Sequence, residues 1–525
     1  MKFSLCVLLS LLLSISISTF GQNAYSKVFN ILNGNEYGVD INLKNENILV
    51  LAVGICDPGL PTRTGCSYSL SFENKNVLSD TFKDNRFILV PNNTTSVQND
   101  TIFIFGVDFR NFPYNFVVYK TNISGDSLGM IKCDKLDTEV FGTSIVVMDS
   151  FIYLLGQFDT PLGKRNLLVQ KLDKNGKLIK EVRYEEENKK IENLGTSMIQ
   201  TSDGNLAFVS YYFENENRHV GVRKLDKNLN TLWIKYFDLT LHASRNQNPW
   251  PHMVATDDGG MVVSNEINIL EDILEGKYKD TGLGEFPVVL SKLDKDGSLN
   301  WTDTLFTYDY PERFLDSPTR MISQLYQCNN GDILCMGEWY CFYCAPRHKA
   351  WLARYSSDGR LLWEHYYTDP NYNIDGFGSY FMDAKEAENG DIICTGSIDD
   401  DYNTYGNDKQ YTWLLRVDSM GCFTPDCFTE DTLTEVIITT NEEITINISG
   451  KIAIYPNPAE GMINISVPEG FDAEEIEVFD VLGNKLVKIQ SNLKELDVKY
   501  FKSGLYFIIV SDKSGRFVTG KFVKG

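Results

Sequence analysis

The stretch Met198-Ile-Gln-Thr-Ser-Asp-Gly-Asn-Leu-Ala-Phe-Val-Ser-Tyr-Tyr212 is the clearest copy of a pattern that returns along most of the chain. Two apolar, alternating runs flank Asp203-Gly204, a dipeptide that tolerates the positive φ angles required by a two-residue β-hairpin turn. Further copies turn at Asp258-Gly259, Asn330-Gly331 and Asn389-Gly390, and weaker ones at Asn45-Glu46, Asn99-Asp100 and Asp149-Ser150. The sequence therefore predicts seven hairpins of this kind.

A second hairpin follows each first hairpin. Its best copies read Lys292-Leu-Asp-Lys-Asp-Gly297 with Trp301 and Arg354-Tyr-Ser-Ser-Asp-Gly359 with Trp363. Two hairpins make a unit of four strands, and the first turns recur every 50 to 72 residues, which excludes stacked coils with a shorter repeat. Four-stranded units repeated roughly four to eight times are typical of β-propellers. We therefore predict an all-β chain with a seven-bladed β-propeller over residues 22–428.

The last blade lacks a good fourth strand of its own. After its final turn the sequence holds Cys422, Pro425 and Cys427, and a proline removes a donor from the strand ladder. The run from Ser26 to Ile31 precedes the first hairpin and has strand character. We predict that it completes the last blade beside residues 413–416, so that the two ends of the ring are joined.

Composition and charge limit which classes of protein this chain can belong to. The 525 residues are 43% hydrophobic and 23% charged, which is typical of a globular chain. The formal net charge is -22, and phosphate backbones and anionic lipid surfaces repel such an acidic chain. We therefore expect no nucleic-acid partner.

The first residues indicate export. Lys2 precedes an apolar run from Leu5 to Ile17, and small residues follow up to Gly21. This layout predicts a cleaved signal peptide over residues 1–21, with an uncleaved anchor as the alternative. The run is too short to span about 30 Å of hydrocarbon, and no later run approaches the required length, so we expect no transmembrane segment.

The cysteines left after cleavage favour local disulfides in an oxidising compartment, because a zinc site needs two further ligands at matched spacing. We predict a disulfide between Cys422 and Cys427. Whether Cys56 pairs with Cys66 and Cys341 with Cys344 is left open. The histidines show no metal-ligand spacing, so neither a metal nor a cofactor is expected. We interpret residues 399–401 as a solvated acidic loop, with a calcium site as the alternative.

Propeller geometry sorts the loops onto two faces. The turns inside each hairpin point to one face and are short, whereas the links between hairpins and between blades point to the other face and are long. Binding sites usually lie on variable loops of a rigid scaffold, so we expect any ligand on the second face.

The link from Glu338 to His348 carries the most chemistry on that face. It combines four aromatic rings with an arginine and a histidine. Flat rings beside a guanidinium group can stack on sugar faces or hold an aromatic ligand; the alternative is that the rings pack against the blade ends. The candidate ligand-binding residues are Trp250, His252, Trp339, Tyr340, Arg347 and His348.

The C-terminal residues 451–525 have a different character. Short alternating strands separated by Gly, Pro and Asp turns predict a small immunoglobulin-like β-sandwich. The preceding residues 429–450 are rich in Thr and Glu and suit an exposed linker. Four features mark the tail in order: Tyr455-Pro-Asn-Pro-Ala459, Asp480-Val-Leu-Gly483, Gly504-Leu-Tyr-Phe507 and Lys521-Phe-Val-Lys524.

In these features the tail resembles the type A C-terminal sorting domain of the type IX secretion system of Bacteroidota. The resemblance implies that the signal peptide delivers the chain to the periplasm and that the folded tail is recognised by the type IX machinery. It also implies a product that is released or attached to the cell surface. The residues expected to act in sorting are Pro456, Asn457, Pro458, Gly483, Gly504 and Tyr506.

The second hairpins also resemble those of pyrroloquinoline-quinone-type propellers, whose tryptophans dock neighbouring blades. No catalytic constellation is evident in the sequence, so we expect a secreted or cell-surface binding protein with an extracellular glycan or protein ligand. The competing hypothesis is an extracellular propeller enzyme, glycan-degrading or quinone-dependent. An inward-facing cluster of acidic and basic residues would favour the enzyme.

Overall fold

The computed structural model of the chain describes residues 24–30, 36–45, 47–55, 65–73, 76–78, 87–89, 94–108, 115–134, 140–159, 165–184, 193–214, 217–242, 251–266, 288–305, 319–340, 348–369, 378–399, 410–424, 427, 434–437, 442–445, 448–467, 473–480, 485–490, 494–512 and 517–525. These residues form strands and turns and contain no helix. The chain divides into two compact units, a larger one of Met1–Val28 with Asn35–Glu442 and a smaller one of Phe29–Gly34 with Glu443–Gly525.

The described part of the larger unit contains seven sheets, called sheets 1 to 7 below. Sheet 1 holds β2 (Glu36–Lys44), β3 (Asn47–Ile55), β4 (Gly65–Glu73) and β5 (Asn76–Leu78). Sheet 2 holds β6 (Phe87–Leu89), β7 (Thr95–Gln98), β8 (Thr101–Asp108), β9 (Asn115–Thr121) and β10 (Ser127–Lys132). Sheet 3 holds β11 (Val140–Met148), β12 (Phe151–Asp159), β13 (Arg165–Asp173) and β14 (Leu178–Tyr184). Sheet 4 holds β15 (Asn193–Gln200), β16 (Leu206–Glu214), β17 (Asn217–Leu225) and β18 (Thr231–His242).

The remaining sheets repeat this order. Sheet 5 holds β19 (Met253–Ala255), β20 (Met261–Glu266), β21 (Val288–Leu293) and β22 (Leu299–Leu305). Sheet 6 holds β23 (Thr319–Gln327), β24 (Ile333–Tyr340), β25 (His348–Tyr355), β26 (Leu361–Thr368) and β30 (Thr434–Ile437). Sheet 7 holds β27 (Tyr380–Glu386), β28 (Ile392–Asp399), β29 (Gln410–Val417) and β1 (Tyr25–Asn30); the short strand β31 (Glu442–Thr445) lies where the chain passes from one unit to the other.

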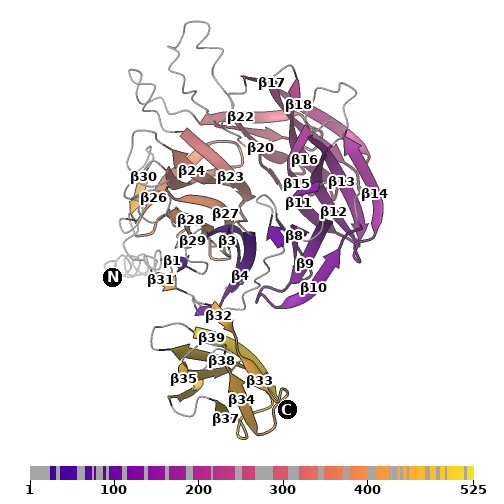
Figure 1. Cartoon of the computed structure of the whole chain (residues 1–525). Coiled ribbons are helices and arrows are strands. Elements are labelled where there is room, and N and C mark those ends of the chain that lie inside the picture. Colours follow the sequence, from indigo (N-terminus) through magenta and orange to yellow (C-terminus); the bar gives the residue numbers. More distant parts are fainter. Residues whose placement is uncertain are drawn as a thin grey trace, which may run out of the picture. The chain divides into compact units, whose positions relative to one another are not determined.

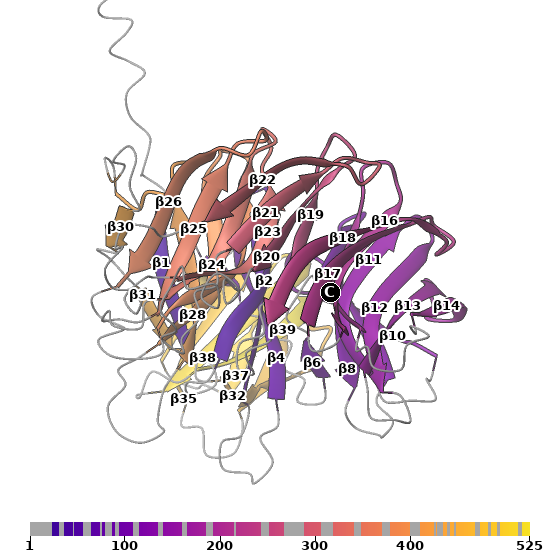
Figure 2. The ribbon, with the colours of Figure 1, turned by 90° about the horizontal axis from the view of Figure 1, so that it is seen from above.

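The sheets follow one another around a centre (Figure 1), and a second view shows the same order (Figure 2). The first strand of each sheet contacts the first strand of the next in the series β7, β11, β15, β19, β23, β27 and β2. Thr95 of β7 donates to Asp40 of β2 and completes the series. The prediction of an all-β propeller is confirmed, and this series is what a ring of seven blades requires; the blade count itself stays a prediction.

An apolar core lies between neighbouring sheets. Successive side chains of a strand point to opposite faces, so each strand contributes to two cores. In β16, Leu206 and Phe208 pack toward sheet 3, whereas Ala207 and Val209 pack toward sheet 5. This explains why the repeat reads as an almost continuous apolar run rather than as an alternation of apolar and polar residues.

The predicted closure is confirmed. Strand β1 lies beside β29 in sheet 7, so the N-terminal run supplies the strand that the sequence after β29 cannot form. The Trp413 indole donates to the Ser26 hydroxyl over 2.8 Å, and Val28 is part of the core shared by sheets 6 and 7. The predicted disulfide between Cys422 and Cys427 is also present.

One expectation about local structure was wrong. At Asp203-Gly204 only the glycine has a positive φ, and residues 201–205 form a longer turn closed by Gly204 donating to Thr201. The true two-residue turns are the weak copies, for example Asn99-Asp100, where both residues have positive φ. Within residues 429–450, β30 pairs in parallel with β26, and the assignment of this range to a linker stays a prediction.

The smaller unit contains two sheets. One holds β32 (Ile448–Lys451), β39 (Phe517–Lys524), β38 (Gly504–Asp512), β35 (Ala473–Asp480) and β36 (Lys485–Ile489), and the other holds β33 (Ala453–Tyr455), β34 (Met462–Ser466) and β37 (Glu495–Asp497). Ile463 and Ile465 of the second sheet share one core with Ile508 and Phe522 of the first. The unit is thus a β-sandwich, and an immunoglobulin-like topology stays a prediction.

Candidate functional site

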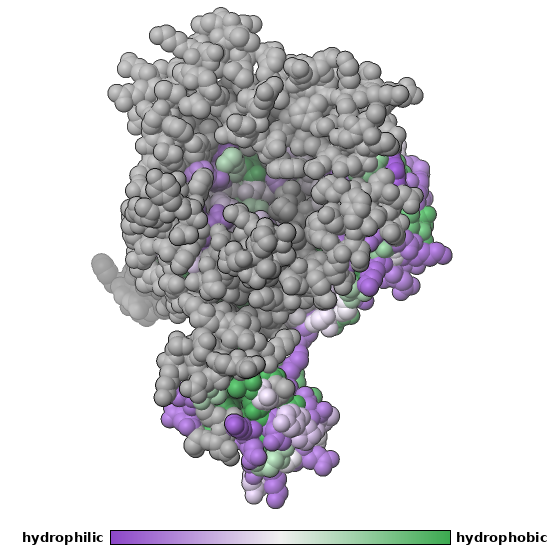
Figure 3. Space-filling model, viewed as in Figure 1, coloured by the Kyte–Doolittle hydropathy of each residue, from purple (hydrophilic) through white to green (hydrophobic). Residues whose placement is uncertain are grey.

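The two faces of the propeller differ in the length of the connections between their strands. On the turn face, defined here by the connections inside each hairpin, two to five residues join successive strands. On the link face, defined by the connections between hairpins and between sheets, the connections vary more in length; most are longer, although residues 215–216 alone join β16 to β17. The longest of these links is residues 267–287. In Figure 3 the described residues visible near the centre of the larger unit are both hydrophilic and hydrophobic.

Buried cations connect neighbouring sheets on the turn face. The Lys224 ammonium, with only 2% of its side chain exposed, lies 2.7 Å from Asp203 Oδ2 in its own sheet. It also donates to the Lys295 carbonyl of the next sheet over 2.9 Å. Equivalent inter-sheet bonds run from Lys171 to the Lys227 carbonyl and from Arg354 to the Ser419 carbonyl. The basic residue of the repeat is therefore a connector between sheets.

Tryptophans make a second connection on the same face. Trp301 Nε1 donates to the Ser357 carbonyl of the next sheet over 3.1 Å. Its ring covers Gly359, where an added Cβ would lie 2.7 Å from the indole. Trp233 covers Gly297 in the same way. These contacts agree with the blade docking that the resemblance to quinone-type propellers implies.

The acidic residue of the repeat shapes the turn itself. Asp294 Oδ1 accepts backbone N–H groups from Asp296 and Ser298, at 2.9 and 2.8 Å. Asp173, Asp226 and Asp418 accept two backbone donors in the same pattern. Because each of these carboxylates accepts backbone N–H groups of its own turn, the need to stabilise that turn explains why Asp recurs in the repeat.

The predicted ligand-binding residues lie in different settings. Trp250 and Arg347 lie outside the described residues, as does the side chain of Tyr340. His252 precedes β19 and is 3% exposed, and burial lowers its pKa to about 3, which keeps the imidazole neutral. This placement favours a packing role for His252. Its assignment to ligand binding stays a prediction.

Trp339 and His348 belong to strands rather than to a loop, because β24 and β25 extend further than expected. The Trp339 ring stacks on Tyr366, with centroids 5.0 Å apart and planes inclined by 19°. The Lys349 ammonium lies 4.9 Å from the first ring centroid and 4.2 Å from the second. The site is thus a cation over two stacked rings at the link-face end of sheet 6.

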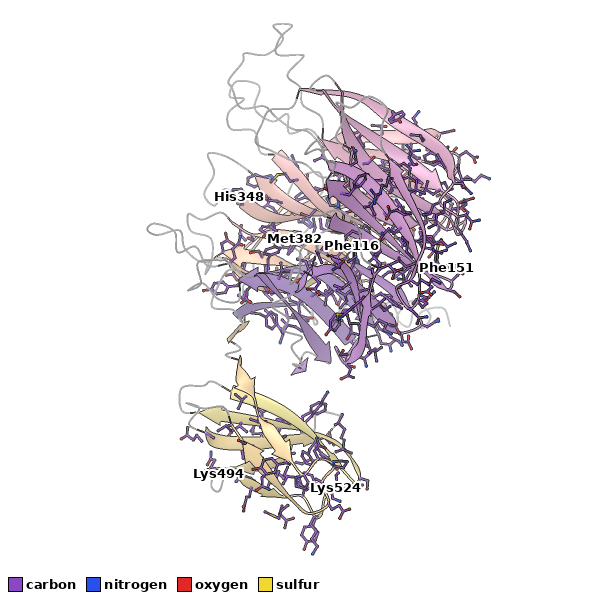
Figure 4. The ribbon with its side chains drawn as sticks, turned by 45° about the vertical axis from the view of Figure 1, so that its right-hand side comes forward. Phe116, Phe151, His348, Met382, Lys494 and Lys524 are labelled. Carbon is purple, nitrogen blue, oxygen red and sulfur yellow. A yellow bond between two sulfur atoms is a disulfide. The ribbon has the colours of Figure 1, made fainter. Side chains whose placement is uncertain are left out.

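His348, labelled in Figure 4, contacts Glu338 across the two strands. Burial lowers the pKa of His348 to about 4, so at neutral pH the ring is uncharged and its Nδ1–H donates to the carboxylate. The contact is then a hydrogen bond rather than an ion pair. The side chain of His348 is 22% exposed and that of Glu338 is 13% exposed, so solvent reaches both groups.

Sequence analysis missed a buried ion pair beside this cluster. Arg320 donates to both carboxylate oxygens of Glu364, at 2.5 and 2.9 Å, and Trp351 Nε1 donates to the same carboxylate over 2.8 Å. Arg320 pairs with Trp339 in the register of β23 and β24. Among the described residues, Arg320 Nη1 and Trp339 Nε1 are buried donors without an acceptor. No local sequence pattern predicts that these residues meet, because they lie on four different strands.

A second polar cluster lies on the first strands of the sheets. These strands share a β-bulge, and the residue after it is polar in β2, β11, β15, β23 and β27, namely Asp40, Ser144, Ser197, Gln324 and Asp383. Met382, labelled in Figure 4, is the bulged residue of β27. Asp383 Oδ2 accepts from the Ile41 backbone over 3.1 Å, and Ser144 Oγ accepts from the Met198 backbone over 3.0 Å. The bulges thus connect neighbouring sheets on the inside of the ring.

Asp40 differs from the other members of this cluster. It is 7% exposed, and burial together with the nearby Asp383 carboxylate raises its pKa to about 7. Thr95 and Asn42 donate to its oxygens at 3.0 Å. Lys385 lies 2.8 Å from Asp383. The cluster therefore holds two carboxylates and one cation, with a proton available near neutral pH.

One described group has the composition of a metal site. His365, Cys422 and Cys427 each offer a ligand atom, and these atoms lie within 4.8 Å of one another. The cysteines are joined in the disulfide, so neither sulfur is a thiolate. For the acidic loop, Asp399 is 1% exposed and accepts from Ser397, whereas Asp400 and Asp401 lie outside the described residues.

Two of the six tail residues expected to act in sorting, Asn457 and Tyr506, contact side chains or backbone of the last strand of the smaller unit. Asn457 Oδ1 accepts from the Val523 backbone over 2.9 Å, and its amide donates to the Lys521 carbonyl. Tyr506 stacks on Phe522 with centroids 5.4 Å apart. Pro456 and Pro458 are exposed, Gly504 begins β38, and Gly483 lies outside the described residues. Figure 4 marks Lys524 in the last strand and Lys494, which directly precedes β37.

Comparison with known families decides the nature of this tail. Residues 453–525 match the family described as Secretion system C-terminal sorting domain. The tail is a type IX secretion sorting domain. A protein with this sorting domain is secreted or displayed on the cell surface and is handled by the type IX machinery. Within the described ranges, no helix has the length and apolar character needed to cross a membrane.

No curated protein matches the chain. Among solved structures, polysaccharide lyase Uly1 is similar over 77% of this chain and 94% of its own, with 9% identity and a TM-score of 0.43. The β-propeller domain of the Trilobed protease from Pyrococcus furiosus is similar over 75% and 94%, with 9% identity and a TM-score of 0.38. A protein of unknown function from Bacteroides caccae is similar over 63% and 94%, with 11% identity and a TM-score of 0.34. At this level of similarity, no function follows for this chain.

Proposed function

We propose that the propeller is an extracellular binding module that takes a glycan or another hydroxyl- or carboxylate-bearing ligand on its link face. The observation that carries this proposal is a pair of buried N–H donors that have no hydrogen-bond acceptor among the described residues. They are Arg320 Nη1 and Trp339 Nε1. A buried N–H without an acceptor is costly, and a ligand oxygen would remove that cost.

The surroundings of these donors suit such a ligand. Trp339 and Tyr366 supply stacked apolar rings, and Lys349 supplies a positive charge over them. Rings and cations together match the alternating apolar and hydroxylated faces of a sugar. The division of the two faces supports the same proposal, because the turn face is occupied by contacts between sheets.

A glycan array probed with the purified protein tests this function. We expect retention of one class of glycan, and at least about a tenfold loss of affinity for Trp339→Phe, which removes the indole N–H but keeps an aromatic ring. Trp363→Phe is the matched control, since Trp363 Nε1 is also buried without an acceptor among the described residues but lies beside the turn at Gly421. Equal losses in both variants, or no retained glycan, would contradict the proposal.

A second candidate function is polysaccharide cleavage, and the Asp40 and Asp383 carboxylates favour it. A proton held near neutral pH beside a second carboxylate is an arrangement used in acid and base catalysis. Incubation of the same glycans with the protein, followed by reducing-end detection, separates the two functions. Turnover that Asp40→Asn abolishes would establish the enzyme, whereas binding without turnover would leave the binding module.

A further inference from the structure

The fourth strand of sheet 6 is more buried than the fourth strands of sheets 2 and 3. Most side chains of β10 are exposed, and those of β14 are at most half-buried. In β26, by contrast, Glu364 is 7% exposed and Tyr367 is fully buried. Among the described strands, β10 and β14 end their sheets, whereas β30 pairs with the outer edge of β26 (Figure 1). The additional strand therefore lies where the fourth strand is buried.

This pairing covers the part of β26 that contributes to the proposed ligand site. β30 runs parallel to β26 and places Glu435 opposite Tyr366. The Tyr366 ring stacks on Trp339. Glu364, two residues earlier and therefore on the same face of the strand, accepts two hydrogen bonds from Arg320. The backbone that positions both side chains is thus the strand that β30 covers.

The pairing of β30 is short, and a tether supports it. A parallel pair of four residues is marginally stable by itself in water. Cys427 is joined to Cys422 by the disulfide and packs against the core shared by sheets 6 and 7. Only residues 428–433 connect it to β30. A short tether raises the local concentration of a strand near its edge, so β30 pairs readily although little free energy is needed to displace it.

We propose that β30 is a strap that controls the ligand site on sheet 6. While β30 is paired, it holds Glu364 and Tyr366 in the geometry that binds the ligand, and its displacement lowers the affinity. This inference rests on the binding function proposed above. By thermodynamic linkage, a bound ligand favours the paired strap by the same factor. Because β30 lies between the propeller and the sorting domain in the sequence, drawing it away from β26 would weaken binding.

The test disrupts β30 in the full chain by combining Glu435→Pro with Val436→Pro. A parallel ladder uses the N–H groups of alternate residues, so two adjacent prolines remove the ladder whichever residue donates. The control combines Asp431→Pro with Thr432→Pro, which precede the strand. In the first variant only, we expect amide hydrogen exchange of residues 365–368 to become at least about tenfold faster. We also expect at least about a fivefold loss of affinity for the glycan that the wild type retains on the array.

Unchanged exchange in the strap variant would overturn the inference, as would faster exchange with unchanged affinity. An equal loss of affinity in the control would also overturn it, because the loss would then not come from the pairing. Circular dichroism checks that both variants fold. If the prolines unfold the chain, Val436→Gly, which weakens a strand without removing an N–H, replaces them with the same expected directions.

A wild type that retains no glycan would contradict the proposed function but would still allow a decision on the strap. The signal of Trp339 is then isolated as the difference between the fluorescence spectra of chains with and without Trp339→Phe. A difference spectrum that the strap prolines change, and the control prolines do not, supports the hold of β30 on the stacked rings. A difference spectrum that stays the same overturns it.

Discussion

The turn face and the link face of the propeller use the same strands for different purposes. On the turn face, a cation or a tryptophan of several sheets contacts the next sheet, as Lys224 and Trp301 do, and the Trp301 ring covers Gly359 there. On the link face, the longest connection between described strands spans residues 267–287. The difference teaches that, among the described residues, the turn face carries a repeated set of contacts between the turns of neighbouring sheets, whereas the link face carries connections of variable length. Four changes test this division.

The largest expected effect is the loss of a buried cation on the turn face. Lys224→Met keeps the aliphatic chain but removes the ammonium group that joins Asp203 to the Lys295 carbonyl. We expect the free energy of unfolding to fall by about 3 kcal/mol, as measured by urea denaturation. The control is Lys227→Met, whose exposed pair with Asp149 should contribute much less. Equal effects would mean that burial of the cation is not what connects the sheets.

The second effect concerns pH and the inside of the ring. The folded-state pKa of Asp40 is raised to about 7, so its contribution to stability is fully present below its unfolded pKa near 4 and is lost as pH rises through 7. Relative to Asp40→Asn, the wild type should therefore lose a few kcal/mol, at about 1.4 kcal/mol per pKa unit, between pH 4 and 7.

Asp149 provides the opposite sign as a control. Lys227 lowers its pKa, so its contribution is present above the unfolded pKa and is lost as pH falls. Denaturation curves of the wild type, Asp40→Asn and Asp149→Asn between about pH 2 and 8 measure both signs, because the change at Asp149 falls below about pH 4. A wild-type protein that gains stability relative to Asp40→Asn as pH rises would show that Asp40 is ionised in the folded state.

The third effect separates the contact of a turn glycine from its backbone conformation. Gly359 and Gly331 have φ angles of 91° and 89°, but a Cβ would lie 2.7 Å from Trp301 at Gly359 and no closer than 4.0 Å to any group at Gly331. We expect Gly331→Ala to cost about 1 kcal/mol from backbone strain, and Gly359→Ala to cost about 1 to 3 kcal/mol more from the clash. Thermal melting of both variants measures the difference, which vanishes if Trp301 moves freely.

The smallest effect belongs to the link face. Replacing residues 270–284 by a short Gly-Ser segment should change the free energy of unfolding by less than about 1 kcal/mol, because loop closure depends only weakly on length. The melting temperature of this variant measures the effect. A loss as large as that of Lys224→Met would show that the link face also holds the ring together.

Local patterns in the sequence predicted much of the fold. Alternation and Gly turns gave the hairpins, and the proline after β29 led correctly to the closure of sheet 7 by β1. The turn types were inverted, because the Asp-Gly turn uses one positive φ and the Asn99-Asp100 turn uses two. Trp339 was assigned to a loop, although it pairs with Lys349 within two adjacent strands.

The candidate site was predictable only in part. The aromatic residues and His348 stood out by composition, whereas Arg320 and Glu364 did not, because their pairing joins positions separated by 44 residues. The same holds for Asp40 and Asp383, which come from sheets 1 and 7 at the two ends of the propeller sequence. A pattern confined to one repeat carries no information about which side chains meet between repeats.

The sequence by itself determined the repeat unit, the end that closes the ring and the domain that directs secretion, because each depends on neighbouring residues or on a contiguous motif. Only the tertiary structure decided which polar groups are buried and paired, from Lys224 on the turn face to Asp40 inside the ring. The physical reason is that burial and electrostatic coupling arise where separate sheets pack together. The residues that meet there are far apart in sequence, so no local pattern predicts which of them come into contact.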